Sequence, residues 1–335
     1  MIVRLRRSLT VHRELLLATG GGALFALSAP PTNGYAWVLI GLGLLAAAMQ
    51  SAERFVAGLL RGALWATAAG LVGLRFVPSV IRLFTDLGTV ASIAAHVLLS
   101  AAQSLTWAIG MGVAAVVRRR LGAPLEVAFA AGVLVTLLLP SVFVWSPAGL
   151  MSPWTPLVQL ADLVGERGVS VALAVSCALA VRGATILAKA RAVSCRRARL
   201  GWSAIVAAVA IPLAMMGYGV HAMKRFSESP EAPGKLAVGL VHAGVDPKER
   251  WQGKHHGRIL RTLQRQTVAV ERAGAELSVW PEAAYPYRLS HQAKRAPRDA
   301  RSPLGGGVRG PVLFGLITVV PPVLVGRDSD GRPLY

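Results

Sequence analysis

The chain has 335 residues, of which 54% are hydrophobic and only 16% are charged, and its mean hydropathy is +0.52. This composition excludes an ordinary soluble protein and favours a membrane protein with a smaller polar part, because soluble domains carry about a quarter charged residues. The formal net charge of +20 is concentrated in short loops, where anionic lipid head groups attract basic residues, so we expect no nucleic-acid partner.

Seven apolar segments are long enough, or nearly so, to cross a bilayer at about 20 residues per helix. They lie at 14–30, 35–50, 55–77, 90–117, 125–146, 169–188 and 201–221. Pro30 and Pro31 cannot continue a helix, so the first two segments should be joined by a tight turn. The basic start could instead belong to a cleaved signal peptide, but Pro30 and the further spans favour an uncleaved helix.

The loops between these segments alternate in charge. Basic residues precede the first span (Arg4, Arg6, Arg7, Arg13) and follow the second (Arg54), the fourth (Arg118–Arg120) and the sixth (Lys189, Arg191, Arg196, Arg197, Arg199), whereas the other loops hold little more than Arg82 and Arg167. By the positive-inside rule the amino terminus is cytoplasmic, and seven spans place everything after His221 on the outer side.

Polar residues within the spans have structural explanations. Arg61 and Arg75 lie close enough to span ends for their side chains to reach the interface. His96, Gln103 and Ser104 share one span, where interhelical hydrogen bonds explain them better than a proton path.

The composition becomes polar after the last span. We predict a transmembrane domain at 1–225, a linker rich in Pro, Ser and Glu at 226–234, and a second domain at 235–335. In that domain, 235–241 reads as a buried strand, and a helix beginning near 246–250 keeps Ile259, Leu263, Thr267 and Val270 on one face until Gly274. Strands are expected at 276–280 and 312–320.

The 276–280 strand ends in Trp280-Pro281-Glu282. Pro281 has no N–H for a strand ladder, so it ends the strand and leaves Glu282 directed out of its carboxyl end. This motif after seven membrane segments resembles the apolipoprotein N-acyltransferase family of the nitrilase (carbon-nitrogen hydrolase) superfamily. The stretch 156–170 is similar to the family's loop before the sixth span, and weak matches follow in order along nearly the whole chain. The resemblance implies an all-α membrane domain followed by part of an α/β nitrilase-like sandwich.

The resemblance also implies a chemistry. In the family a cysteine thiolate attacks a phospholipid ester, a glutamate takes the thiol proton, and a lysine stabilises the oxyanion; the acyl chain then passes to the terminal cysteine of an apolipoprotein. Glu282 matches the glutamate. We expect a monomer of the bacterial inner membrane, with 235–335 periplasmic, phospholipid and apolipoprotein as substrates, and neither cofactor nor metal.

The lysine and cysteine of that chemistry have no counterpart here. No cysteine follows Cys195, Cys177 lies within a span, and Lys294 in a proline-containing loop is a poor substitute for the family's lysine. We therefore expect a truncated chain that is inactive alone. Two alternatives remain open: a conjugal-transfer TraB-type protein of similar plan, and a non-catalytic membrane scaffold or decayed homologue.

The remaining polar motifs are weak. Adjacent His255 and His256 after Lys254 point about 100° apart on a helix and do not have metal-ligand spacing. His242 ends the first strand near Glu282, where a satisfied polar residue is the simpler explanation, and Trp280 fits core packing as well as substrate contact. One basic group is either a solvated loop or a phosphate contact: Arg288, Lys294, Arg295, Arg298 and Arg301.

Overall fold

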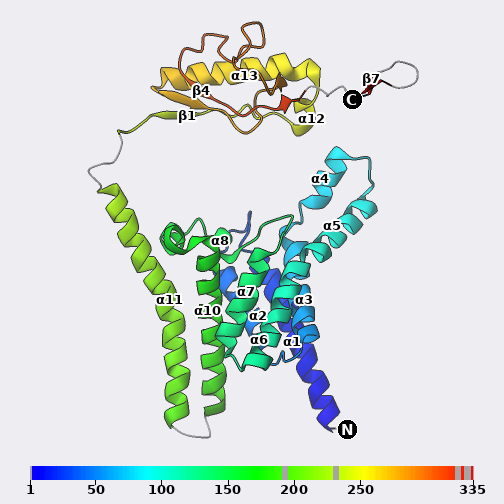
Figure 1. The fold of residues 1–335 in the computed structure, drawn as a ribbon, viewed down its shortest axis with the longest axis vertical. Helices are drawn as coiled ribbons and strands as arrows, with labels where there is room; N and C mark the ends of the chain where they lie inside the picture. Colours follow the sequence, from blue (N-terminus) through cyan, green and yellow to red (C-terminus); the bar gives the residue numbers. More distant parts are fainter. Residues whose placement is uncertain (1, 191–194, 229–233, 321–325, 328–332, 335) are drawn as a thin grey trace. The chain divides into compact units, whose positions relative to one another are not determined.

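The computed structural model describes residues 2–190, 195–228, 234–320, 326–327 and 333–334. It divides into two compact units, Met1–Ala232 and Pro233–Tyr335. The first unit is helical and the second combines strands with helices (Figure 1).

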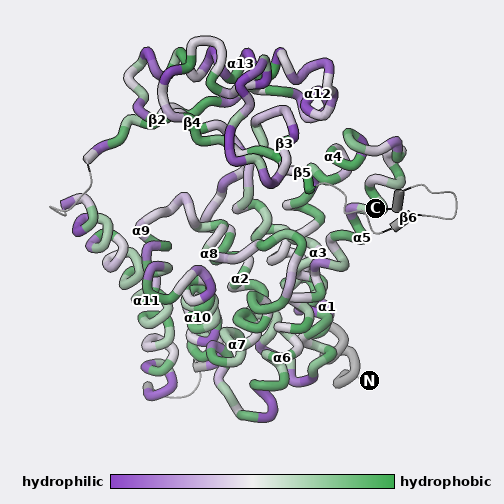
Figure 2. Tube along the Cα trace, turned by 45° about the horizontal axis from the view of Figure 1, so that its top comes forward, coloured by the Kyte–Doolittle hydropathy of each residue, from purple (hydrophilic) through white to green (hydrophobic). Residues whose placement is uncertain are grey.

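Eleven helices are described in the first unit, many of them apolar along their length. They are α1 (Ile2–Ala26), α2 (Ala36–Met49), α3 (Phe55–Gly73), α4 (Val77–Phe84), α5 (Thr89–Gln103), α6 (Leu105–Leu121), α7 (Leu125–Leu138), α8 (Pro147–Leu150), α9 (Thr155–Val158), α10 (Ala161–Ala190) and α11 (Cys195–Ser227). Figure 2 shows hydrophobic residues running along the long helices. This pattern is that of a membrane domain.

Four helical stretches in the described part of the chain are long and apolar enough to cross a membrane: Phe55–Gly73, Thr89–Leu121, Ala161–Lys189 and Arg196–Ser227. Two further apolar helices, Ala36–Met49 and Leu125–Leu138, are shorter than a full crossing. The seven spans expected from the sequence are therefore not all confirmed by length and composition.

Several span boundaries differ from those expected. The segment expected at 55–77 ends at Gly73, and α4 begins separately at Val77. The segment expected at 125–146 stops at Leu138, two residues before Pro140, because the residue preceding a proline is disfavoured in helical conformation. α10 begins earlier than expected and contains a break at Gly165, whose φ of 68° a residue with a side chain rarely adopts.

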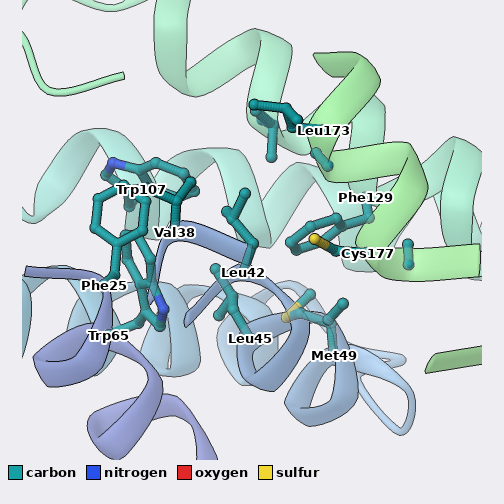
Figure 3. Packing of buried hydrophobic residues seen from close by; sticks show 14 of the residues in the cluster. Phe25, Val38, Leu42, Leu45, Met49, Trp65, Trp107, Phe129, Leu173 and Cys177 are labelled. Carbon is teal, nitrogen blue, oxygen red and sulfur yellow. The ribbon is translucent and has the colours of Figure 1, made fainter. Parts of the chain in front are cut away.

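The core of the helical unit contains a cluster of aromatic rings that pack against one another at tilted angles (Figure 3). The Trp65 ring centroid lies 4.6 Å from that of Phe25 and 4.4 Å from that of Trp107, and Trp65 Nε1 donates to Gly41 O at 3.0 Å. At Gly22 a Cβ would fall 1.8 Å from Trp65 O, so α1 can approach α3 this closely only with glycine there.

Arg61 differs from the expectation that its side chain reaches the interface. It is 6% exposed and forms an ion pair with Glu14 of α1, while its guanidinium also donates to Ala48 O at 2.8 Å and Ser51 Oγ at 3.1 Å. An internal carboxylate and a helix-end carbonyl satisfy the charge, which removes the need to reach solvent. Glu14 and Arg61 are 47 positions apart in the chain, so no local pattern indicates this partner. Arg75 is exposed beyond the end of α3, as expected.

The second unit contains a parallel three-stranded sheet packed on one long helix. Its strand order is β1 (Val238–Leu240), β2 (Leu277–Val279), β4 (Val312–Leu313). The short α12 (Pro247–Arg250) precedes α13 (Gly253–Arg272), which connects β1 to β2. The predicted apolar face of this helix is the buried one, since Ile259, Leu263 and Thr267 are 3%, 1% and 0% exposed.

Two strand predictions need correction. The stretch 235–241 is not a fully buried strand, because Val238 and Leu240 project from a sheet face that is open in this unit and are 47% and 78% exposed. The single strand expected at 312–320 is divided into β4 and β5 (Thr318–Val319), and β5 pairs with β3 (Leu289–Ser290) in a separate small sheet. A further antiparallel pair joins β6 (Gly326–Arg327) and β7 (Pro333–Leu334). With so few strands, the nitrilase-like sandwich is not confirmed.

Candidate functional site

The candidate site lies at the carboxyl ends of β1 and β2 in the second unit. Parallel strands direct the residues that follow them to one edge of the sheet, where ligands of α/β folds commonly bind. His242 follows β1, and Glu282 follows β2 after Trp280 and Pro281. Both His242 and Glu282 line a small pocket of about 80 Å³.

Trp280 anchors the end of β2. Its ring is 3% exposed and its Nε1 donates to Thr267 Oγ1 of α13 at 2.9 Å, while its backbone N–H donates to Leu313 O at 2.9 Å. The ring centroid also lies 5.4 Å from that of Phe314. Of the two roles considered for Trp280, the structure therefore supports core packing.

The backbone after Pro281 forms a tight turn that holds Glu282 at the strand end. Ala284 N–H donates to Pro281 O at 3.1 Å, and Ala283 has φ = 49°, a left-handed conformation that costs a residue with a side chain about 1–3 kcal/mol. Such a conformation persists only where neighbouring structure enforces it.

Two neighbours enforce this turn. Arg250 donates through Nη2 to the carbonyl oxygens of Glu282, at 3.0 Å, and of Ala283. On another side Gly315 lies so close that a Cβ would stand 2.8 Å from Ala283 N and 3.2 Å from Glu282 Cα. The backbone carrying Glu282 is therefore held by contacts with two distant parts of the unit. Neither Arg250 nor Gly315 has a sequence signal that predicts this role, although Arg250 lies within the predicted start of a helix.

The Glu282 carboxylate itself is exposed and, within the described residues, makes no hydrogen bond or ion pair. It remains free to accept a proton or a hydrogen bond from a bound group. His242 is also exposed, and its Nδ1 accepts a hydrogen bond from Gly244 N–H at 3.2 Å. This bond makes His242 a partly satisfied turn residue, in line with the simpler explanation.

A second pocket of about 330 Å³ lies beside the same turn. Ala283 and Arg250 line it together with Tyr285, Tyr287 and His256. From the basic group identified in the sequence, Arg288 and Arg301 also reach this pocket, whereas Lys294, Arg295 and Arg298 do not line it. Lys294 lies in an exposed loop and contributes to neither pocket.

Ionisation around the second pocket follows from burial and hydrogen bonding. Burial raises the pKa of Tyr285, whose hydroxyl donates to Arg301 O at 2.7 Å. Hydrogen bonds from Arg301 lower the pKa of Asp299, and the same pairing raises the pKa of Arg301. The Arg301 charge is thus partly neutralised, whereas Arg288 has no ion pair among the described residues.

The remaining sequence candidates belong to α13 and to the helical unit. His255 and His256 begin α13, where the His256 ring lies 5.4 Å from that of Tyr287, and no group of three or more metal-ligating residues was found among the described side chains. In the helical unit, Gln103 exchanges two 2.9 Å hydrogen bonds with the Phe143 backbone, and His96 Nε2 lies 3.2 Å from Leu71 O. These are the expected contacts between segments; Ser104 instead donates to Ala101 O of its own helical stretch.

The two cysteines belong to the helical unit. Cys177 is 7% exposed and lies within α10, with Sγ 3.4 Å from Leu39 O. The side chain of Cys195 lies outside the described residues. Cys177 is therefore a packed residue of the helical core.

An apolar helical domain followed by a small α/β unit with a carboxylate at a strand end defines a membrane protein with a polar appended domain. Residues 21–179 match the family model described as the apolipoprotein N-acyltransferase N-terminal domain. Two relatives are named apolipoprotein N-acyltransferase. That from Gloeobacter violaceus is 25% identical over 96% of this chain and 60% of its own length; that from Photobacterium profundum is 25% identical over 83% of this chain and 51% of its own length.

The chain is therefore similar to proteins of the apolipoprotein N-acyltransferase family, at low identity. The chain spans between half and two thirds of the length of these relatives. The family and the apolar helices together indicate a bacterial membrane protein.

Proposed function

We propose that this chain supplies the membrane domain and the general base of a phospholipid-dependent N-acyltransferase acting on apolipoproteins. The observation that carries the proposal is the placement of Glu282 at the end of the central strand β2, on a turn held by Arg250 and Gly315. A carboxylate with a fixed backbone and no partner among the described residues suits proton transfer, since a general base must be positioned before it can act.

In the proposed reaction the Glu282 carboxylate accepts the proton of a cysteine thiol. The thiolate attacks the ester carbonyl of a phospholipid and forms a thioester, and the ester oxygen leaves with the proton from Glu282 as the hydroxyl of a lysophospholipid. The amino group of the apolipoprotein's terminal cysteine then attacks the thioester, forms an amide and regenerates the thiol. Residues 235–335 contain no cysteine, so the proposed thiolate comes from outside this stretch.

The residues that line the second pocket suit the binding of a lipid head group. Arg250 and Arg288 line it beside Tyr285 and Tyr287, and guanidinium groups bind phosphate oxygens well. We assign to this pocket the phosphate of the acyl donor.

The proposed membrane arrangement has seven spans, with the amino terminus cytoplasmic and the Glu282 unit periplasmic. The four long apolar stretches, the two shorter ones and α1 together make seven. Shorter helices can serve as spans where the bilayer thins or flanking residues reach the interface. The protein is proposed to act as a monomer in the inner membrane.

The experiment that tests the base joins residues 1–335 to the carboxy-terminal part of the Gloeobacter violaceus relative and measures acyl transfer from labelled phospholipid. Glu282→Gln should lower the rate by about 10² to 10⁴, the usual cost of losing a general base. The matched control is Glu276→Gln at the other end of the same strand region, which should leave the rate within about threefold of the parent. Equal rates for the Glu282 variant and its parent would exclude the proposed role.

A further inference from the structure

A cationic pocket lies in the helical unit, where the ends of α2, α6, α7 and α10 meet. It has a volume of about 580 Å³, and three basic side chains line it: Arg118, Arg182 and Lys189. This size is in the range of small-molecule sites, about 300–1,000 Å³. None of these residues has a role in the chemistry proposed for Glu282.

The three basic groups keep most of their hydrogen-bonding capacity free. Arg182 pairs through Nη1 with Glu126, and Arg118 Nη1 donates to Met49 O at 3.1 Å. A guanidinium carries five N–H donors, so on each arginine four have no partner among the described residues. Lys189 has no ion pair or hydrogen bond among the described residues. The three positive side chains and the single negative charge of Glu126 give the pocket a net charge of +2.

Two polar residues that line the pocket, Gln50 and Thr185, form hydrogen bonds within the helical unit. Gln50 Nε2 donates to Thr185 Oγ1 at 2.8 Å, and Thr185 Oγ1 lies 2.8 Å from Val181 O, to which it can donate. These contacts join the end of α2 to α10 and fix the face of α10 that carries Arg182 and Lys189. The surface of α10 that carries Arg182 and Lys189 is therefore held by a contact with the end of α2.

Apolar side chains complete the lining. Leu125 at the start of α7 and Ile186 of α10 lie beside the basic groups. A polar anion alone would gain nothing from these two residues, whereas an amphiphile could place its anionic group against the cations and its hydrocarbon against Leu125 and Ile186. Basic pockets between membrane helices commonly bind lipid head groups in this way.

We propose that this pocket binds the phosphate of an anionic phospholipid, with Arg118, Arg182 and Lys189 contacting the phosphate and with Leu125 and Ile186 contacting the adjoining glycerol and methylene groups. A lipid bound there would contact, and so stabilise, the ends of α2, α6, α7 and α10. It extends beyond the proposed acyl transfer and does not depend on it.

Native mass spectrometry of the full chain in neutral detergent, titrated with phosphatidylglycerol, tests the proposal. We expect one saturable lipid whose binding weakens about fivefold in Lys189→Gln, as one cation contributes about that factor. Arg119→Gln also removes one positive charge, from the last turn of α6 next to Arg118, but Arg119 is exposed and does not line the pocket, so it should change the affinity less than about twofold.

A second variant, Arg182→Gln combined with Glu126→Gln, removes the ion pair without leaving an unpaired carboxylate, and it should also weaken binding. Unchanged far-ultraviolet circular dichroism would show that both variants fold. Equal losses in Arg119→Gln and Lys189→Gln would overturn the site, because they would show a general charge effect. Equal affinity for phosphatidylcholine would overturn the requirement for an anionic lipid, and equal affinity for inorganic phosphate would overturn the lipid assignment.

Discussion

Replacing Glu14 with glutamine tests the ion pair inside the helical unit. The side chains of Arg61 and Glu14 are 7% and 10% exposed. Glutamine keeps the shape of the side chain but removes its charge, so the Arg61 guanidinium is left buried with only neutral acceptors at Ala48 O and Ser51 Oγ. Removing one partner of a buried pair costs about 3–5 kcal/mol.

The corresponding change in melting temperature can be estimated from the size of the unit. For a domain of about 150–250 residues, 1 kcal/mol shifts Tm by about 2–4 °C, so Glu14→Gln should lower Tm by about 6–20 °C. Thermal unfolding in detergent, followed by circular dichroism, measures this. Arg75→Gln, at an exposed arginine beyond α3, is the control and should change Tm by no more than about 2 °C.

A double variant separates the loss of the charge from the loss of the shape. Glu14→Gln with Arg61→Met removes both charges and should recover much of the lost stability, because the cost of the single variant comes from the charge left behind. Two results would contradict the role given to the ion pair: a Tm of Glu14→Gln equal to that of the parent, or a double variant whose loss of stability equals the sum of two independent losses.

Three further outcomes follow from the described contacts. Gly315→Ala should destabilise the second unit by about 1–3 kcal/mol and speed hydrogen exchange in the turn after β2, because its Cβ would contact that backbone; Gly253→Ala, where a Cβ meets nothing within 4 Å, should do neither. The raised pKa of Tyr285 contributes stability that is present below its unfolded pKa of about 10 and is lost as pH rises through the folded value, so alkaline unfolding should be steeper in the parent than in Tyr285→Phe. A reporter active only in the periplasm should be active when fused after Ser227 and silent when fused after Arg199, and the opposite pattern would reverse the proposed orientation.

The sequence by itself predicted the features that depend on local composition. Long apolar runs predicted the helices, since nearly every expected span coincides with a helix in the first unit. The 3.6-residue spacing of Ile259, Leu263 and Thr267 predicted the buried face of α13. Pro281 predicted the end of β2 next to Glu282, because a proline cannot donate to a strand ladder.

Only the tertiary structure decided which distant residues meet. Arg61 pairs with Glu14, 47 positions away, and no periodicity in either segment indicates that contact. The turn that holds Glu282 depends on Arg250 and Gly315, each more than 30 residues distant. The strand expected at 312–320 divides because its two halves pair with different strands, β2 and β3. Local propensity describes what each segment can form, whereas these contacts are chosen by the packing of all segments together.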